Sequence, residues 1–229
     1  MSLTGATELA NSGLNLQAVF NLCDLPASLL AQLPDNASRE FTQLLLFAHG
    51  GRRLWEVLNH SEKQTNDPID EFAIHILEFH LFPLYPQHHF EVVFPGEHII
   101  DLQKLGELAG WHHASPFMVG INKTWGTWFA YRAVVLANTQ LPVTVPVAET
   151  SPCSVCFTKD CKMACAGKAV KPDCFEISSC LEYRKQENSL CKDKCLSRLA
   201  CPVASEHRYT MEQINYHYKV SLKTILSHY

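Results

Sequence analysis

The sequence has no run of about 20 apolar residues, which is the length that a membrane-spanning helix needs. Its first five residues contain neither a basic segment nor an apolar segment of the kind found in secretory signals. An excess of positive charge is also missing, because 19 basic residues face 23 acidic ones and the net charge is −4. These absences predict a cytoplasmic protein without a membrane partner, and they argue against a nucleic-acid partner.

Apolar residues are abundant enough for a packed core. Of the 229 residues, 47% are hydrophobic and 18% are charged, a balance that excludes an intrinsically disordered chain. The length predicts one large domain or two small ones.

The apolar pattern predicts a mixture of helices and strands. Asp67 and Pro68 suit the start of the clearest helix, because Asp can cap free amides and Pro fits the first helical turn. Two neighbouring strands near residue 125 indicate an antiparallel pair, so the predicted fold class is α+β. The predicted elements are helices at 26–33, 52–59, 67–83 and 101–109, and strands at 43–48, 89–94, 116–121 and 128–137.

Changes in composition divide the chain into four segments. Residues 1–140 form an α+β domain for a cofactor or substrate, and residues 141–151, with Pro142 and Pro146, form a linker. Residues 152–203 are a cysteine-rich module, and residues 204–229 are a C-terminal tail expected to pack on the first domain.

Nine of the ten cysteines lie between Cys153 and Cys201, and only Cys23 stands apart. In a reducing compartment such a density rarely means disulfides, although a disulfide scaffold in an exported protein is an alternative. Thiolates are the ligands that soft metals and iron–sulfur clusters select. Residues 152–203 contain nine basic and six acidic residues, so this segment carries +3 and the remainder −7. Positive charge nearby lowers the cost of bound thiolates.

The cysteine spacing is typical of a cluster ligand pattern. The first run reads Cys153-x2-Cys156-x4-Cys161-x3-Cys165, the second reads Cys191-x3-Cys195-x5-Cys201-Pro202, and Cys180 lies between them. Bacterial proteins with two iron–sulfur clusters use C-x2-C-x2-C-x3-C-P, in which the fourth cysteine serves the other cluster. The eight cysteines are therefore candidate ligands of 4Fe–4S clusters.

Zinc is the main alternative to iron and sulfur. The four cysteines of the first run could form a tetrahedral zinc site, which would make the chain a zinc-stabilised interaction protein. Zinc ribbons, however, usually separate their two cysteine pairs by a dozen or more residues, and this run is much shorter.

The residues Leu108–Trp111 and Gly126–Phe129, followed by the cysteines, resemble epoxyqueuosine reductases and the related reductive dehalogenases. The resemblance covers residues 40–203. It implies a nitroreductase-like, cobalamin-binding domain followed by a ferredoxin-like module with two 4Fe–4S clusters. It also implies a crossed ligand assignment, with Cys174 and Cys23 left free. One cluster would be held by Cys153, Cys156, Cys161 and Cys201, and the other by Cys165, Cys180, Cys191 and Cys195.

Two features of those enzymes have no counterpart here. Their proton-donating Asp lies in the strand that reads Val92-Val93-Phe94-Pro95-Gly96 in this chain, so no catalytic acid is assigned. Their C-terminal helical repeats, which contribute to tRNA binding, have no counterpart after Val203, which further argues against a nucleic-acid partner.

A second resemblance links Gly126–Leu136, Asp67–Asp70 and Glu206–Tyr209 to the cobalamin-processing, cyanocobalamin-decyanating reductases. These share the nitroreductase-like fold and lack the cysteine module. The two resemblances imply four candidate cobalamin-binding residues, with Arg132 meeting an anionic group through its planar side chain. The four are Trp111, Gly126, Trp128 and Arg132.

The leading hypothesis is an iron–sulfur redox protein, an oxidoreductase if it is an enzyme. It would take electrons from a low-potential donor and relay them through two 4Fe–4S clusters to cobalamin or a similar small-molecule cofactor or substrate. A cobalamin-binding or trafficking protein without redox turnover is the alternative.

Overall fold

The computed structural model describes residues 4–59 and 67–228. The segment on which the absence of a secretory signal was judged therefore lies mostly outside the described residues. Internal contacts divide the chain into two compact units. The first unit comprises residues 1–111 and 129–148, and the second comprises residues 112–128 and 149–229. Each unit is described by itself below.

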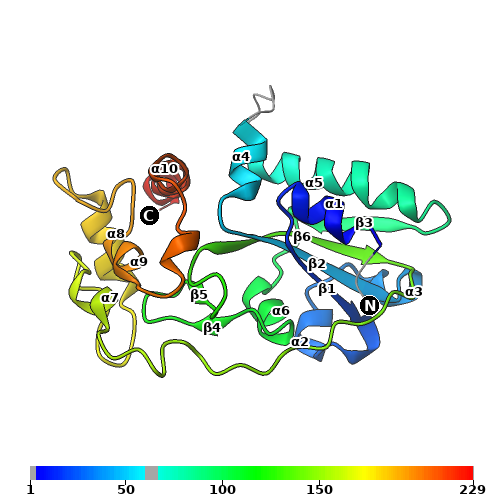
Figure 1. Cartoon of the computed structure of the whole chain (residues 1–229), viewed down its shortest axis with the longest axis horizontal. Helices are drawn as coiled ribbons and strands as arrows, with labels where there is room; N and C mark the ends of the chain where they lie inside the picture. Colours follow the sequence, from blue (N-terminus) through cyan, green and yellow to red (C-terminus); the bar gives the residue numbers. More distant parts are fainter. Residues whose placement is uncertain (1–3, 60–66, 229) are drawn as a thin grey trace. The chain divides into compact units, whose positions relative to one another are not determined.

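The first unit contains a four-stranded antiparallel sheet with the strand order β1-β2-β6-β3 (Figure 1). Strand β2 is buried along its whole length, which confirms the strand expected at 43–48. The strands are β1 (Leu16–Asn21), β2 (Gln43–Gly50), β3 (Phe90–Phe94) and β6 (Phe129–Ala137).

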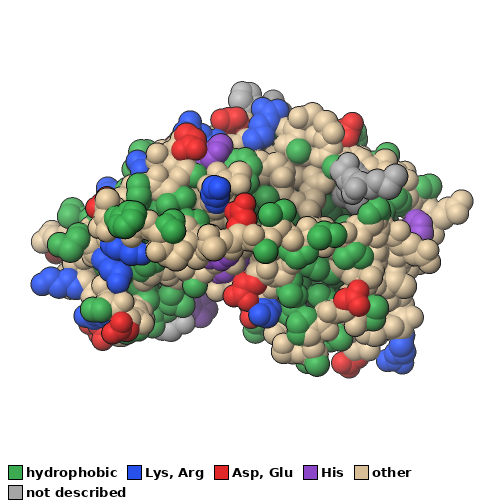
Figure 2. Space-filling view, turned by 60° about the horizontal axis from the view of Figure 1, so that its bottom comes forward, with side chains coloured by type: hydrophobic (Ala, Val, Ile, Leu, Met, Phe, Trp, Pro, Cys, Tyr) green, Lys and Arg blue, Asp and Glu red, His purple; other side chains and the backbone are tan. Residues whose placement is uncertain are grey.

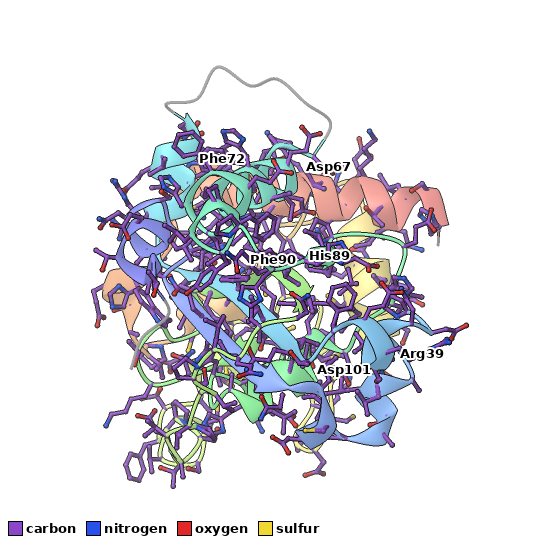
Figure 3. All side chains as sticks on the ribbon, turned by 90° about the vertical axis from the view of Figure 1, so that its right-hand side faces the viewer. Arg39, Asp67, Phe72, His89, Phe90 and Asp101 are labelled. Atoms are coloured by element: carbon purple, nitrogen blue, oxygen red, sulfur yellow. The ribbon has the colours of Figure 1, made fainter. Side chains whose placement is uncertain are left out.

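Helices cover both faces of this sheet (Figure 1). On one face lie α1 (Ala6–Asn11), α4 (Arg53–Asn59) and α5 (Pro68–His80), and on the other lie α2 (Ala27–Leu30) and α6 (Leu102–Leu108). A short helix, α3 (Ala37–Glu40), precedes β2, and single 3-10 turns occupy Leu22–Asp24 and Phe82–Leu84. In Figure 3, Phe72 belongs to the buried side of α5, whereas Arg39 extends away from the fold.

Alternation along the strands explains the two packed layers. Residues two apart in a strand share a face of the sheet. Leu44 and Leu46 of β2 therefore join Leu29 and Leu105 in one core on the α2 and α6 side. Leu45 points to the opposite face, where α5 packs against β6 and α4 against β2. This three-layer arrangement is a mixed α/β fold with an antiparallel sheet.

The expected capping of α5 by the Asp67 side chain is wrong. Asp67 occupies the N-cap position of α5, but its side chain makes no capping hydrogen bond. The Asp101 side chain does cap a helix, because it accepts a hydrogen bond of 2.9 Å from the backbone N–H of Lys104 at the start of α6.

The predicted hairpin of 116–121 with 128–137 is also wrong. Strand β6 is apolar enough to be a central strand, and it pairs with β2 and β3 in the first unit. The residues before it form a separate ribbon in the second unit, where β5 (Gly120–Ile121) pairs with β4 (His113–Ala114). Asn122 closes the following turn, because its side-chain oxygen accepts a hydrogen bond of 2.7 Å from the backbone N–H of Trp125.

The second unit is built from three short helices, one helix of 18 residues and long irregular loops (Figure 1). Its helices are α7 (Asp160–Met163), α8 (Ile177–Lys185), α9 (Leu196–Ala200) and α10 (Met211–His228), with a 3-10 turn at Ser205–His207. Helix α7 packs against α9, and α10 packs against α8. Helix α10 lies in the segment that the sequence analysis treated as a C-terminal tail, and the contacts assign it to the second unit.

The expected linker contains no helix or strand, and it is anchored to β1 within the first unit. The backbone N–H of Thr144 donates to the Val19 carbonyl at 2.9 Å, and the Val19 N–H donates to the Thr144 hydroxyl at 2.9 Å. Among the helices of the described residues, none combines the length and the apolar character needed to cross a bilayer.

Candidate metal centres

All ten cysteines are free thiols, so the disulfide-scaffold alternative is wrong. Eight of them lie in the second unit as two sets of four, contributed by α7, α8 and the loops around α7 and α9. Cys23 and Cys174 are exposed and belong to neither set. The two sets coincide with those that the resemblance to epoxyqueuosine reductases implies.

The first set, here named the Cys201 group, consists of Cys153, Cys156, Cys161 and Cys201. Burial raises the pKa of the Cys161 thiol, and the thiols of Cys201, Cys153 and Cys156 raise it further. Cys201 joins the other three because it directly follows α9, which packs against the helix that carries Cys161. A cysteine 40 residues beyond Cys161 thus completes a local cysteine loop.

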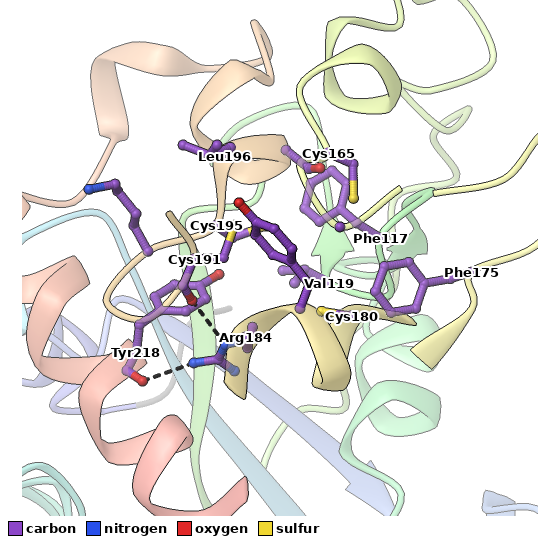
Figure 4. Close-up of a pocket in the computed structure, with 14 residues that line it drawn as sticks. Phe117, Val119, Cys165, Phe175, Cys180, Arg184, Cys191, Cys195, Leu196 and Tyr218 are labelled. Carbon is purple, nitrogen blue, oxygen red and sulfur yellow. Dashed lines mark hydrogen bonds between the residues drawn. The ribbon is translucent and has the colours of Figure 1, made fainter. Parts of the chain in front are cut away.

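The second set, the Cys180 group, consists of Cys165, Cys180, Cys191 and Cys195. All four line one cavity of about 150 Å³ (Figure 4). Burial raises the pKa of Cys180 to about 11, and the other three thiols of the group contribute to the rise. Phe117, Val119 and Phe175 are among the apolar residues that line the same cavity.

Cations lie close to both groups, and they offset part of the rise in the pKa of the thiols. In the Cys201 group, Lys159 acts to lower the pKa of Cys153, and Arg208 acts to lower that of Cys201, although burial keeps both pKa values raised. In the Cys180 group, Arg184 acts in the same direction on the pKa of Cys180 and of Cys191, against the larger effect of burial.

Arg184 is buried, and neutral groups hold its side chain in place. Its Nε donates to the Cys191 carbonyl and its Nη2 to the Tyr218 carbonyl, each at 3.0 Å (Figure 4). Its Nη1 donates to the Ser221 hydroxyl, also at 3.0 Å. The guanidinium also lies 5.3 Å from the centre of the Tyr218 ring. None of these three acceptors neutralises the charge, so a positive charge is fixed beside the four thiols.

Backbone amides point at the sulfur atoms in both groups. The Ala169 N–H donates to Cys165 Sγ at 3.3 Å, and a hydrogen bond from the Leu196 backbone lowers the pKa of Cys191 against the dominant effect of burial. The Lys162 and Val203 backbones do the same for the pKa of Cys161 and of Cys201. Hydrogen bonds to sulfur stabilise thiolates and tune the potential of iron–sulfur clusters.

Within residues 4–59 and 67–228, no three His, Cys, Asp or Glu side chains form a group that could hold a metal ion as they stand. The donors of the Cys180 group nevertheless fit a polynuclear cluster, because four soft thiol ligands surround one cavity. Ser197, which also lines this cavity, has a buried hydroxyl with no hydrogen-bond partner among the described residues. That hydroxyl is available as a donor to a bound group.

Two of the four candidate cobalamin residues, Gly126 and Trp128, lie in the second unit. Gly126 has φ = +58°, and a Cβ atom there would lie 2.2 Å from the Val203 carbonyl oxygen, next to the Cys201 turn. Trp128 is fully buried, with the Arg198 guanidinium 4.6 Å from its ring centre and the Tyr209 ring packed edge-on at 5.4 Å. Both residues therefore have packing roles in the unit that carries the cysteines.

The other two candidates, Trp111 and Arg132, lie in the first unit. Trp111 is partly buried against the core on the α2 and α6 side. Arg132, on β6, donates from Nε to Nδ1 of the buried His49 at 2.9 Å, and its Nη1 lies 3.4 Å from the Asp70 carboxylate. Within this unit Arg132 therefore meets the carboxylate of Asp70.

Sequence reasoning did not identify Arg184, Ser197 or Tyr218 as part of a site. A usable signal existed for Arg184, which follows Cys180 by four residues on a helix and so shares a face with it. Tyr218 lies in α10, far from the cysteines in the sequence, and nothing in its neighbourhood pointed to them.

Neither protein-family models nor curated protein sequences match this chain. Solved structures do match it. Epoxyqueuosine reductase from Bacillus subtilis aligns with a TM-score of 0.58 and 13% identity over 90% of this chain and 66% of that enzyme. An epoxyqueuosine reductase solved with an epoxyqueuosine-modified tRNA stem loop gives 0.57 and 12%, over 92% of this chain and 67% of that one. A B12-trafficking protein of C. elegans, CblC, gives 0.47 and 14%, over 97% and 95%.

The two comparisons with epoxyqueuosine reductases show the fold. The chain adopts the fold of the epoxyqueuosine reductases. It does so across 66% of the Bacillus subtilis enzyme, so a third of that protein has no counterpart here. Because one neighbour was solved with a tRNA stem loop, the comparisons do not support the argument against a nucleic-acid partner.

Proposed function

We propose that this chain is an iron–sulfur redox protein whose second unit binds two 4Fe–4S clusters, one in each cysteine group. The observation that carries the proposal is the division of eight thiols into two sets of four. Burial is the largest cause of the raised pKa of each shifted thiol, and every thiol that adds to the rise belongs to the same set. Four converging thiols per set are the ligands that a 4Fe–4S cluster requires.

Two observations favour clusters over zinc. The zinc alternative combines Cys165 with the first three cysteines, whereas Cys165 lies with Cys180, and Cys201 takes its place in the first set. In addition, the cavity of the Cys180 group measures about 150 Å³. A cavity for one water molecule needs only about 10–15 Å³, so this space suits a group of several atoms better than one ion.

When bound, the clusters would supply one-electron transfer at potentials set by nearby charge, hydrogen bonds and exposure. The protein's own residues would then have separate tasks. The eight cysteines act as thiolate ligands, and the backbone amides of Lys162, Ala169, Leu196 and Val203 hydrogen bond to the sulfurs. Arg184 places a positive charge at the Cys180 group, where it offsets the negative charge of bound thiolates.

The proposal assigns to the first unit the binding of cobalamin or another small-molecule electron acceptor. It is supported by the sequence resemblance and by the shared fold. Trp111 and Arg132 are its candidate residues in that unit. Titration with hydroxocobalamin tests this part, because binding shifts the visible spectrum and reduction of cobalt follows only if electrons reach it. Binding without reduction favours the trafficking alternative.

Metal analysis after anaerobic reconstitution tests the cluster assignment. The holoprotein is expected to absorb broadly near ~400 nm and to contain about eight irons and eight sulfides per chain. The Cys180→Ser and Cys201→Ser variants are each expected to lose about half of the iron. Cys174→Ser and Cys23→Ser are the matched controls, since both cysteines are exposed and outside the groups. Less than about one iron per chain, or stoichiometric zinc in its place, contradicts the proposal.

A further inference from the structure

Large apolar side chains are exposed on the loop that carries the first three cysteines of the Cys201 group. Phe157 is 98% exposed, Met163 is 88% exposed and Val155 is 66% exposed. Val155 and Phe157 flank the partly exposed Cys156, and Met163 follows Cys161 by two residues. Single exposed apolar residues are common, but three within nine residues around a candidate metal centre indicate an interaction surface.

The same loop is positively charged. Residues 152–171 contain four lysines and one aspartate, whereas the whole chain has a net charge of −4. The Nζ of Lys159 hydrogen bonds to the Cys153 carbonyl, and the Nζ of Lys162 donates to the Pro172 carbonyl at 3.0 Å. Carbonyl oxygens position these ammonium groups without neutralising them. Figure 2 shows hydrophobic and basic side chains close together on the left-hand part of the surface, over α7–α9.

We infer that this donor face, made of Val155, Phe157, Lys159, Lys162 and Met163, docks a small acidic electron-transfer protein. The inference rests on the proposed function, because the Cys201 group must hold a cluster for the docking to matter. The donor's reduced 2Fe–2S centre would lose one electron, the cluster of the Cys201 group would gain it, and no proton or atom would be transferred. Electrons would thus enter at the Cys201 group.

The combination of residues favours a protein partner over RNA. Transient redox complexes bury small areas, and opposite charges steer the two proteins together. Met is common on surfaces that accept varied protein partners. Of the three exposed apolar side chains only Phe157 is aromatic, so the face offers one ring for a base and not the row of aromatic rings on which successive bases stack. A second copy of this chain would bring two positive loops together, which is unfavourable.

The test uses the reconstituted holoprotein and a reduced plant-type ferredoxin, an acidic protein of low reduction potential. Iron content and reduction by dithionite are measured first, since both are independent of docking. The rate of cluster reduction by ferredoxin is then followed by bleaching near ~400 nm, and the affinity of the two proteins by calorimetry. Phe157→Ser combined with Met163→Ser is expected to slow the reaction and weaken binding by about tenfold or more.

Lys162→Glu is expected to slow the reaction and to reduce its dependence on salt, because it removes a steering charge. Ile99→Ser and Lys223→Glu are the matched controls. Ile99 is 92% exposed and lies in the first unit, and Lys223 is exposed on α10, so neither substitution should change the rate. If the double variant fails to take up iron, Phe157→Ser alone serves, since its side chain is almost completely exposed.

The outcomes separate the two claims. Wild-type protein without iron overturns the proposed function and this inference with it. Wild-type protein with eight irons, whose reduction by ferredoxin is unchanged in the Phe157 variants or equally slowed in Ile99→Ser, overturns the docking alone. Loss of RNA stem-loop binding in Phe157→Ser with unchanged ferredoxin reduction assigns the face to nucleic acid. Loss of self-association in the same variant, again with unchanged reduction, assigns it to a second copy.

Discussion

Each of the two units of this chain is stabilised in a different way. The first has a continuous apolar core in which Leu44, Leu46 and Leu136 pack against helices. In the second, the buried apolar cluster is built on Trp128, Tyr209 and Ile214, and the loops that carry the cysteines are mostly half-buried. Small domains with little core commonly depend on bound metals for their stability. The difference indicates that the first unit folds on its own core and that the second depends on what its thiols bind.

Removal of iron is expected to have the largest effect on this comparison. Without clusters, amide protection in α8 and α9 should fall to nearly that of an unfolded chain, because the binding free energy of the metals is also folding free energy. Protection in β2 should stay the same. Hydrogen exchange of the holoprotein and of the chelated protein, resolved by segment, measures the protection of α8, α9 and β2. Re-addition of iron and sulfide should restore the protection of α8 and α9. Full protection of α8 and α9 in iron-free protein would contradict the proposal that the second unit depends on its clusters for stability.

Gly126→Ala is expected to damage one centre and spare the other. A Cβ at this position would lie 2.2 Å from the Val203 oxygen, so the turn after Cys201 must shift. About four of about eight irons should be lost, and the Cys180 group should keep its cluster.

Gly13→Ala is the matched control for this substitution. Gly13 also has a positive φ, and its Cβ would lie 2.4 Å from the Leu54 Cα in the first unit. This variant should lose roughly 1–3 kcal/mol of stability and no iron. Equal iron contents in the two variants would mean that Gly126 has no special relation to the Cys201 group.

Arg184→Gln is expected to change a potential without removing a cluster. The buried guanidinium would stabilise the more negative, reduced state of a cluster in the Cys180 group, so its loss should lower the midpoint potential of that cluster by about 59 mV, a tenfold change in the equilibrium constant. Arg184→Lys keeps the charge and loses the three-way hydrogen bonding, so its shift should be smaller.

Redox titrations followed by electron paramagnetic resonance resolve the two centres in these variants. Arg39→Gln, at an exposed position of the first unit, should leave both potentials unchanged. An iron-loaded Arg184→Gln protein with unaltered potentials would contradict a role for this charge.

The smallest effect concerns Tyr131 of the first unit, whose pKa is raised above its ordinary 10.0 by burial and then by Glu107 and Asp101. The folded state therefore keeps the phenol proton that the unfolded state loses above pH 10. Its stabilising contribution is complete below pH 10 and is lost as pH rises toward the raised pKa, by at most about 1.4 kcal/mol per pH unit. Urea denaturation of iron-free protein between pH 9 and 11 should show this slope, and Tyr131→Phe should flatten it. An equal slope in both proteins would exclude Tyr131 as the cause.

The sequence predicts the elements of the first unit better than those of the second. Strand β2 is apolar throughout, so its identity follows from local composition. The pairing of β6 could not be predicted in the same way, because its partners β2 and β3 are distant in the sequence while β5 is close. Local order favoured a hairpin, and long-range packing decided against it.

In the candidate site, too, long-range packing could not be predicted from the sequence. Spacing alone groups Cys165 with Cys153, Cys156 and Cys161, and only the packing of α7 against α9 brings Cys201 to that loop. Arg184 could have been inferred from its place four residues after Cys180 on α8, but Tyr218 could not be assigned to the site until α8 and α10 were placed against each other. Residue types and spacing therefore predicted the candidate ligands, while the arrangement of the charged and aromatic groups beside them required the fold.

Native mass spectrometry of paired cysteine variants tests the central claim most directly, because it counts intact clusters per chain. If the two groups are separate centres, Cys165→Ser combined with Cys180→Ser removes ligands from one group and should leave one 4Fe–4S cluster bound. Cys161→Ser combined with Cys165→Ser removes a ligand from each group and should leave none. A Cys161/Cys165 double variant that keeps one cluster would show that these two cysteines share a centre, and would contradict the account.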